Sequence, residues 1–401
     1  METKKLLLMT HTDLDGYGCK LLMGYVADYL KMELTTIHTS PGKVEKVLLS
    51  LFDKNDNRYE LEYSMFDLVV VSDLSVTEEG FALSEKISDS NEIMWFDHHN
   101  TSVDVLEKHH PETKTNFIVM VDDNGKLECG TSLIFRVFDE IDWLADDPIS
   151  TIRYIVETIR MYDTYSFENG DTPEAIDAPL LNTLFWNTDK DEFINIMKFY
   201  INNNVLRFIN IEYTGIDKDE RVVPLFKSLI RSMSNIKIDY EDQGLFGDFN
   251  FTLAMVNNYI NGVLSSCIGK EDAYVKRKVE EAKFNSKQND GNLAKYFSDL
   301  STKDGRKLKN PKKVYAVVAD QCQPRIGKGI LRELDADIAV VIDTSLEKAS
   351  LYSIGDTYDV SEFAKCFGGG GHKNASGFTL SYGWGQTTIN SIMLWIHSLI
   401  A

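Results

Sequence analysis

Apolar residues in this chain gather in short runs that stop abruptly at polar or charged positions. The runs Leu6 to Met9, Leu68 to Val71 and Ile93 to Phe96 have the length and composition of buried β-strands. Apolar positions recur at helical spacing over 131–138 and 149–159. Strands that alternate with helices in this way predict an α/β fold around a parallel sheet.

A second group of elements follows towards the end of the chain. Apolar runs over 314–319, 338–342 and 348–354 predict three strands, and the pattern over 326–334 predicts a helix after the first of them. These elements indicate a second, smaller α/β domain. The run Phe251 to Val256 also predicts a strand.

The composition is that of a globular protein with more than one core. The chain has 401 residues, of which 43% are hydrophobic and 11% are aromatic, and this is enough for two domains. We expect an α/β domain over residues 1–185, a helical connector over 186–245 and the smaller α/β domain over 246–401. The two α/β domains would be joined across a cleft.

Acidic residues and histidines stand where the first three strands end. Ligands collect outside the carboxyl ends of parallel strands, so these side chains should meet in one crevice although they are distant in sequence. A further aspartate follows the helical pattern that begins at residue 149. The candidate metal ligands are His11, Asp13, Asp15, Asp73, His98 and Asp163.

The ligand types narrow the choice of metal and reaction. Carboxylates and imidazoles without thiolates favour Mn²⁺ or Mg²⁺ over a structural zinc. We expect two Mn²⁺ ions, with Mg²⁺ and Co²⁺ as alternatives, because the candidate ligands are too many for one ion that keeps open positions. Two ions about 3.5–4 Å apart stabilise the attacking and leaving oxygens of an in-line phosphoryl displacement. Phosphoester hydrolysis is therefore the predicted reaction.

Each motif has a simpler explanation when it is taken alone. Asp15-Gly16 is a common turn pair, and His98-His99 is compatible with a satisfied pair near the surface. Three independent strand ends that carry acids or histidines are hard to obtain from ordinary loops. Their combination favours a functional site.

The motifs, taken in order, resemble those of the DHH phosphoesterases, a family named for the triplet found here as Asp97-His98-His99. His11 to Gly16 resembles the first motif of the family, Asp73 the second, the triplet the third and Asp163 the fourth. Many members have their first histidine four residues before the first metal aspartate. Here the separation is two residues, which resembles the oligonucleotide-degrading branch.

The resemblance implies a role for each of these residues. His99 would touch the scissile phosphate or assist the leaving oxygen, and Asp97 would support a histidine. The implied ligand sets are His11 and Asp13 for one ion, Asp15, His98 and Asp163 for the other, and Asp73 as the bridge between them.

A glycine run near the end of the chain indicates a second site. Gly368 to Gly371 precede His372 and Lys373, and backbone N–H groups without side chains can form a nest around an anion. A flexible linker is rarely followed at once by such residues and by the strand predicted over 377–380. The stretch resembles the glycine-rich histidine motif of the DHH-associated domain, which grips the far end of a nucleotide substrate.

The substrate contacts differ from the usual family pattern at one position. The family often has an arginine within Leu-Arg-Ser, whereas this chain has Tyr352, which offers a stacking face in place of a bidentate phosphate contact. Arg325 and Lys328 are candidates to replace the lost charge. The predicted substrate-binding residues are Gly369, Gly370, Gly371, His372, Lys373, Ser376, Arg325 and Tyr352.

Charge and targeting signals bound the range of partners. A formal net charge of −20 argues against a long groove that follows many phosphates, so short oligonucleotides or dinucleotides fit better than long duplexes. No apolar stretch has the length of a membrane span or a signal peptide, and the five scattered cysteines fit a reducing compartment. We expect a cytoplasmic protein without membrane contacts, and a homodimer is left open.

These observations together predict a manganese-dependent phosphodiesterase that hydrolyses short single-stranded RNA oligonucleotides to nucleoside 5′-monophosphates, similar to the nanoRNase type of the family. Alternatives with the same chemistry are a phosphodiesterase for cyclic or linear dinucleotides and a RecJ-like single-strand DNA exonuclease. A family II pyrophosphatase is disfavoured by the ending Gly370-Gly371-His372. A catalytically silent nucleotide sensor is disfavoured because all the candidate ligands are present.

Overall fold

The structure is a computed structural model in which the chain forms two compact units, Met1–Cys267 and Ile268–Ala401. It describes residues 3–41, 43–52, 65–88, 92–109, 113–139, 149–203, 249–288, 297, 300–302, 305–343 and 348–379. Most of the expected connector, over 204–245, lies outside the described residues. The domain boundaries at 185 and 245 stay predictions.

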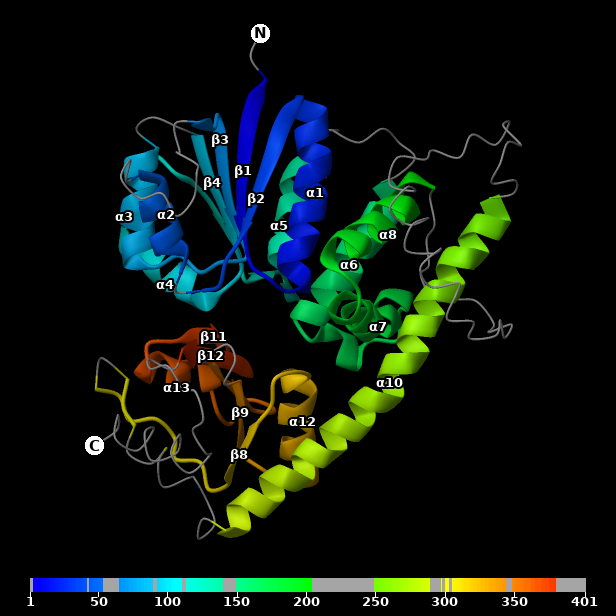
Figure 1. The fold of residues 1–401 in the computed structure, drawn as a ribbon. Helices are drawn as coiled ribbons and strands as arrows, with labels where there is room; N and C mark the ends of the chain where they lie inside the picture. Colours follow the sequence, from blue (N-terminus) through cyan, green and yellow to red (C-terminus); the bar gives the residue numbers. More distant parts are fainter. Residues whose placement is uncertain are drawn as a thin grey trace. The chain divides into compact units, whose positions relative to one another are not determined.

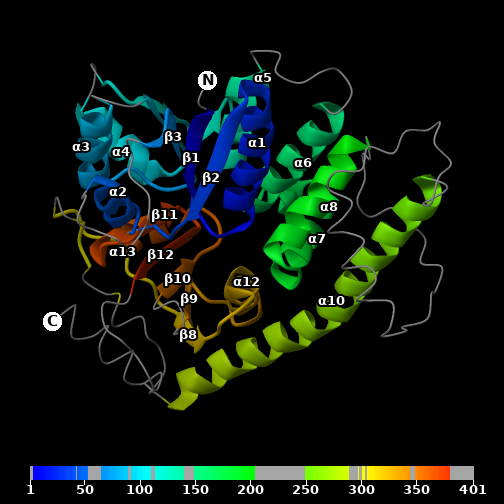
Figure 2. The same cartoon turned by 45° about the horizontal axis from the view of Figure 1, so that its top comes forward.

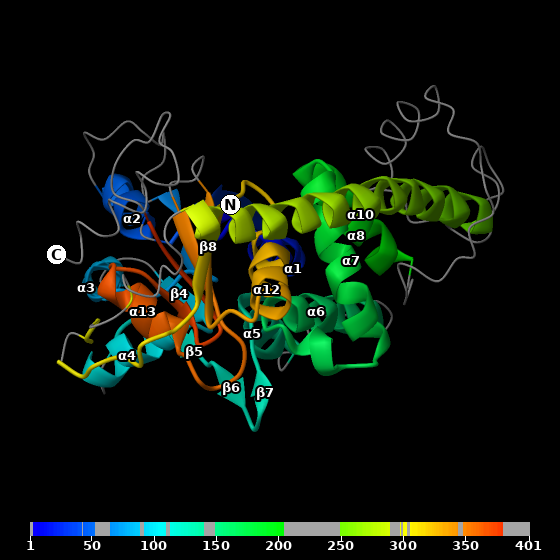
Figure 3. The same cartoon turned by 90° about the horizontal axis from the view of Figure 1, so that it is seen from below.

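The first unit is built on a five-stranded parallel sheet with the strand order β2-β1-β3-β4-β5. Its strands are β1 (Lys4–Thr10), β2 (Met32–His38), β3 (Leu68–Ser72), β4 (Glu92–Asp97) and β5 (Asn116–Val119). The three apolar runs predicted as strands lie in β1, β3 and β4, so the α/β class is confirmed. A small hairpin of β6 (Asp122–Asp123) and β7 (Lys126–Leu127) follows β5 (Figure 3).

Helices cover both faces of this sheet, because the central strands are apolar on both sides. In β1, Leu6 and Leu8 join one hydrophobic cluster, whereas Leu7 and Met9 join the cluster on the opposite face. One face packs against α1 (Leu14–Leu30) and α5 (Gly130–Asp139), and the other against α2 (Val44–Phe52), α3 (Glu78–Ile87) and α4 (Asn100–His109) (Figure 1).

Further helices of the first unit pack against α1, either directly or through another helix. They are α6 (Ile149–Asp163), the short 3-10 helix Ser166–Asn169, α7 (Pro173–Asn187) and α8 (Lys190–Asn202) (Figure 2). Of these, α6 and α8 contact α1 directly, and the others pack through α6. The helices predicted over 131–138 and 149–159 lie within α5 and α6. None of the helices in the described ranges is both long enough and apolar enough to cross a bilayer.

The prediction of a strand at Phe251 to Val256 is wrong, because these residues lie in the long helix α10 (Phe249–Gln288). Val256, Ile260 and Leu264 follow one another at intervals of four residues and are all buried in the core of the first unit. That spacing places them on one face of a helix. A short apolar run does not by itself distinguish a strand from a buried helical segment.

The second unit contains a mixed five-stranded sheet with the order β11-β12-β10-β9-β8. Its elements are β8 (Val314–Val318), α12 (Gln323–Glu333), β9 (Ile338–Asp343), β10 (Lys348–Tyr352), α13 (Val360–Cys366), β11 (Gly370–His372) and β12 (Ala375–Thr379). Among the described strands of this sheet, β8 and β9 run parallel and the other pairs antiparallel. The three strands and the helix predicted here are confirmed, with α12 and α13 packed in separate hydrophobic clusters.

The topology of the first sheet determines where a site can form. The strands β1 and β3 are neighbours, and the helices that follow them, α1 and α3, lie on opposite faces. Chain segments that diverge in this way leave a crevice outside the carboxyl ends of the two strands. The residues after β1 and β3 include His11, Asp13 and Asp73.

Candidate metal centre

The first group of candidate ligands lies where β1 gives way to α1. Asp13 is the N-cap residue of α1, and its Oδ1 accepts a hydrogen bond of 3.0 Å from the Gly16 amide. Its Oδ2 lies 2.6 Å from His11 Nδ1, and the same nitrogen lies 3.8 Å from Asp73 Oδ2. His11, Asp13 and Asp73 thus offer three donor atoms within 4.8 Å of one another.

The second group comes from three further points in the chain. Asp15 lies in the first turn of α1, His98 follows β4, and Asp163 is the last residue of α6. His98 Nε2 lies 3.5 Å from Asp163 Oδ2. Each of the three residues contributes one donor atom, and these atoms again lie within 4.8 Å of one another.

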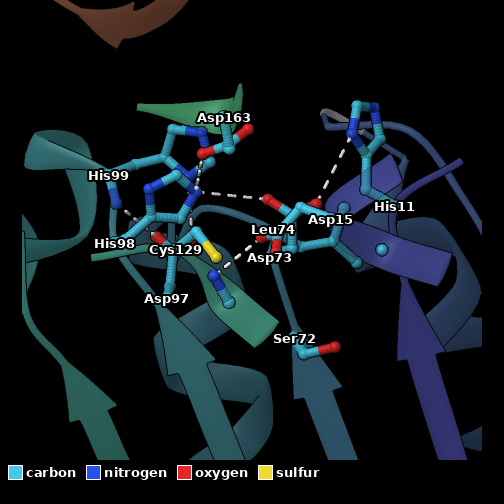
Figure 4. A network of polar contacts seen from close by, with 12 residues as sticks. His11, Asp15, Ser72, Asp73, Leu74, Asp97, His98, His99, Cys129 and Asp163 are labelled. Carbon is cyan, nitrogen blue, oxygen red and sulfur yellow. Dashed lines mark hydrogen bonds and ion pairs between the residues drawn. The ribbon is translucent and has the colours of Figure 1, made fainter. Parts of the chain in front are cut away.

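Asp73 lies between the two groups. Its Oδ2 faces His11, while its Oδ1 lies 3.3 Å from His98 Nε2 (Figure 4). The structure therefore brings together all six ligands expected from the sequence, in the two sets implied by the family resemblance. That each of them coordinates a metal stays a prediction.

The four carboxylates of this cluster repel one another. Burial raises the pKa of Asp73 well above its ordinary value, and the nearby charges of Asp13, Asp15 and Asp163 raise it further. The pKa of Asp163 is raised in the same way, by burial and then by Asp15 and Asp13. Such a cluster is favourable only when positive charge offsets the repulsion.

Two buried oxygens show where that positive charge would be bound. Asp73 Oδ2 and Asp163 Oδ2 accept no hydrogen bond from the described residues, although buried polar atoms are normally paired. One of these oxygens belongs to each group of candidate ligands. Oxygen and imidazole donors with unused lone pairs fit divalent cations such as Mn²⁺ or Mg²⁺.

The N-terminus of α5 holds Asp15 in place. The backbone amides of Gly130 and Thr131 donate to the two carboxylate oxygens of Asp15 at 2.7 and 2.9 Å, and the Thr131 hydroxyl donates to the Asp15 carbonyl at 2.8 Å. A side chain at position 130 would lie 2.9 Å from both Asp15 Oδ2 and Asp73 Cβ. Sequence reasoning predicted the helix but not this contact, for which the glycine at its start was the available signal.

The predicted catalytic pair is also in contact. Asp97 is fully buried, and its Oδ1 lies 2.7 Å from His99 Nδ1 while its Oδ2 accepts a hydrogen bond from the Ser102 hydroxyl. Burial disfavours ionisation of Asp97, but the charge and hydrogen bond of His99 outweigh it and lower the pKa of Asp97. An ionised Asp97 accepts a hydrogen bond from Nδ1–H of His99 and so defines the orientation of this imidazole.

A further histidine, His38, was not expected from the sequence and supports the group formed by His11, Asp13 and Asp73. His38 Nδ1 lies 2.8 Å from the His11 carbonyl, and the His38 ring stacks on Tyr17 with 4.1 Å between centroids. Burial lowers the pKa of His38, which favours a neutral ring that donates from Nδ1. His38 therefore helps to position the backbone of His11.

Most of the predicted substrate-binding residues lie on or beside one hairpin of the second unit. Those in or next to β11 and β12 are Gly369, Gly370, Gly371, His372, Lys373 and Ser376. Tyr352 is the last residue of the adjacent strand β10, and Arg325 is exposed in the first turn of α12. Lys373 Nζ lies 2.6 Å from Asp356 Oδ1, and the Ser376 hydroxyl donates to the His372 carbonyl at 3.2 Å. Their contacts with a substrate stay predictions.

Packing accounts for part of the glycine run and for Tyr352. A Cβ atom at Gly369 would lie 2.1 Å from the Gly377 carbonyl oxygen, and Gly371 has a φ of +134°. Tyr352 is 6% exposed, and its ring packs against Gly327. Its ring is therefore part of the core of this unit and offers little surface on which a base could stack.

No family model matches the chain. Oligoribonuclease NrnB of Bacillus subtilis (strain 168) is 24% identical over 379 residues, which are 93% of this chain and 72% of that protein. RecJ in complex with Mn²⁺ from Thermus thermophilus is 11% identical, with a TM-score of 0.46, 99% of this chain covered and 51% of RecJ covered. The pGpG-specific phosphodiesterase PggH from Vibrio cholerae is 12% identical, with a TM-score of 0.37 and coverage of 98% and 99%.

The ordered motifs, the parallel sheet and the match to NrnB fit a DHH-family nucleic-acid phosphoesterase, a hydrolase that acts on phosphoester bonds. Within that family, the match over 93% of the chain fits the nanoRNase type.

Replacement of Gly130 by alanine is expected to disturb both groups of ligands. The new methyl group would press on Asp15 and Asp73 at the same time. We expect Gly130→Ala to weaken Mn²⁺ binding about 10–100-fold, as is typical when a contact that orients a ligand is lost. Isothermal titration with Mn²⁺ measures this. Gly24→Ala is the matched control, because nothing lies within 4 Å of a Cβ atom at that position of α1.

Replacement of Asp73 by asparagine is expected to stabilise the metal-free protein at about pH 8 but not at about pH 4. The raised pKa of folded Asp73 means that its ionisation costs folding free energy. This cost is absent below the ordinary pKa of 3.8 and grows as the pH rises towards the folded pKa. Thermal unfolding of Asp73→Asn and parent protein in a chelator measures the difference, with exposed Asp28→Asn as the control. An equal difference at both pH values would contradict the electrostatic argument.

Proposed function

We propose that this protein is a manganese-dependent phosphodiesterase that hydrolyses short RNA oligonucleotides to nucleoside 5′-monophosphates. The observation that carries the proposal is the pair of donor groups, His11 with Asp13 and Asp15 with Asp163 and His98, on either side of Asp73. A pair of divalent cations suits phosphoryl transfer, because the charge that develops on a phosphoryl group is spread over several oxygens.

The ligand roles follow the donor sets. His11 and Asp13 would hold one cation, Asp15, His98 and Asp163 the other, and Asp73 would contact both. Bound there, the two cations would supply the positive charge that stabilises the phosphoryl transition state. The first two backbone amides of α5 hold the Asp15 carboxylate in a defined orientation, so it would bind a cation without rearrangement.

His99 is the residue that we assign to the reacting groups. Asp97 holds its Nδ1 atom at 2.7 Å, so Nε2 is the ring nitrogen that we assign to the substrate. The His99 side chain is 18% exposed, whereas that of Asp97 is fully buried. We therefore assign proton transfer to the leaving oxygen to His99 and the orientation of its ring to Asp97.

Two observations support a short substrate. The net charge of −20 opposes the binding of a long polyanion, whereas a few nucleotides require only local positive charge. The relative that matches 93% of the chain is named an oligoribonuclease. We assign the binding of the distal nucleotide or terminal phosphate to the β11–β12 hairpin, with His372 and Lys373 as the polar and cationic contacts.

The substrate class is tested with a length series of RNA and DNA oligomers, together with linear and cyclic dinucleotides and added Mn²⁺. We expect the fastest hydrolysis for RNA of two to about five nucleotides, with nucleoside 5′-monophosphates as products and a steep decline for longer chains. Hydrolysis that is faster on long DNA would favour the exonuclease alternative. Hydrolysis restricted to dinucleotides would favour the dinucleotide phosphodiesterase.

Loss of Asp73 should remove activity without unfolding the protein. Asp73→Ala deletes the carboxylate shared by the two groups, so we expect hydrolysis to fall at least about 10³-fold while thermal stability without metal is kept or raised. Steady-state turnover and a thermal melt measure the two effects. Glu79→Ala, which removes an exposed carboxylate on α3, should leave turnover unchanged. Normal turnover of Asp73→Ala would refute its shared role.

His372 should affect substrate binding more than the chemical step. We expect His372→Ala to raise KM for a dinucleotide about tenfold with kcat reduced less than about threefold, because the residue would contact the distal end in both ground and transition states. Thr379→Ala, at the exposed far end of β12, serves as the control on the same hairpin. A large fall in kcat with unchanged KM would contradict this assignment.

A further inference from the structure

The turn that follows β3 has an unusual backbone conformation. Asp73 has a φ of +52°, in the left-handed region, which among residues with a side chain is adopted mainly by asparagine and aspartate. Asp73 is only 3% exposed, and its carboxylate lies between the two donor groups. Several buried groups from neighbouring elements donate hydrogen bonds to this turn or accept hydrogen bonds from it.

One of these groups is a tryptophan on the neighbouring strand. Trp95 lies in β4 with no exposed surface, and its Nε1 donates a hydrogen bond of 2.7 Å to the carbonyl of Leu74, the residue after Asp73. The amide of Asp73 itself donates to the Phe96 carbonyl at 2.9 Å. The strand β4 is therefore hydrogen-bonded to the backbone of the turn both at Asp73 and at the residue that follows it.

A serine of α4 binds the other end of the turn. Ser102 is fully buried, and its hydroxyl accepts a hydrogen bond of 2.7 Å from the Val76 amide while it donates to Asp97 Oδ2. Asp97 in turn binds His99. One hydroxyl group thus connects the turn that carries Asp73 with the pair that orients His99.

We propose that Trp95 and Ser102 are positioning residues of the metal centre, which hold the Asp73 turn in register with Asp97 and His99. The proposal deepens the proposed function and rests on a cation being bound at Asp73. Neither residue belongs to the motifs that resemble the family. Trp95 acts through the Leu74 carbonyl, and Ser102 acts through the Val76 amide and the Asp97 carboxylate, so neither needs to touch a substrate.

The variants Trp95→Phe and Ser102→Ala in the full-length protein test this role. Each removes a hydrogen-bonding group and keeps most of the apolar volume. Titration with Mn²⁺ followed by electron paramagnetic resonance, without substrate, should show an affinity reduced about 10–100-fold in each variant. The matched control is Ser84→Ala, since Ser84 is equally buried but its hydroxyl donates to a carbonyl of its own helix, that of Phe81. We expect Ser84→Ala to bind Mn²⁺ as the parent does.

Mn²⁺ affinities that stay within about threefold of the parent in both variants would overturn the proposal, whatever their melting temperatures. If Ser102→Ala does not fold, Trp95→Phe decides the question alone. If the parent protein is active, we expect kcat of each variant to fall together with its Mn²⁺ affinity, while KM for a dinucleotide changes less than about threefold. A general loss of packing would not produce this combination. A parent that binds Mn²⁺ but does not hydrolyse RNA would contradict the proposed function and leave the Mn²⁺ affinities as the test of positioning.

Discussion

Repulsion among four carboxylates at one edge of a parallel sheet is the constraint on which this structure depends. Two of them are stabilised by helix N-termini, since Asp13 caps α1 and Asp15 accepts hydrogen bonds from the first amides of α5. Asp73 and Asp163 have no equivalent among the described residues, and burial raises the pKa of both. The helix N-termini thus offset part of the negative charge of the cluster, and the proposed cations would offset the remainder.

The elements around the cluster are connected through the same residues. Asp15 links α1 to α5 across 115 positions of sequence, and Ser102 links α4 to the turn after β3 and to Asp97. Each of these contacts satisfies a buried polar group and orients a candidate ligand or its neighbour at the same time. Stability of the domain and geometry of the site therefore cannot be varied independently at these positions.

In the second unit, residues predicted from the sequence to bind substrate also have a role in packing. Close packing beside β12 requires one glycine of the glycine run, because a side chain at Gly369 would meet the Gly377 carbonyl. This packing requirement exists whether or not an anion binds there. Lys373 is paired with Asp356 on the surface, so a phosphate that binds to Lys373 would compete with a carboxylate. A weak, exposed ion pair is readily exchanged for a phosphate contact.

The sequence by itself determined β1, β3 and β4 of the first sheet and β8, β9 and β10 of the second, because buried strands are continuous apolar runs. It also supplied the six candidate ligands, most of which follow the carboxyl ends of parallel strands. It predicted a strand at Phe251 to Val256, and this was wrong, because these residues lie in α10 with Val256, Ile260 and Leu264 buried on one face. The support of Asp15 by Gly130, the left-handed turn at Asp73 and the burial of Tyr352 were decided by tertiary structure alone. These features depend on contacts between distant parts of the chain, and a local sequence pattern does not predict such contacts.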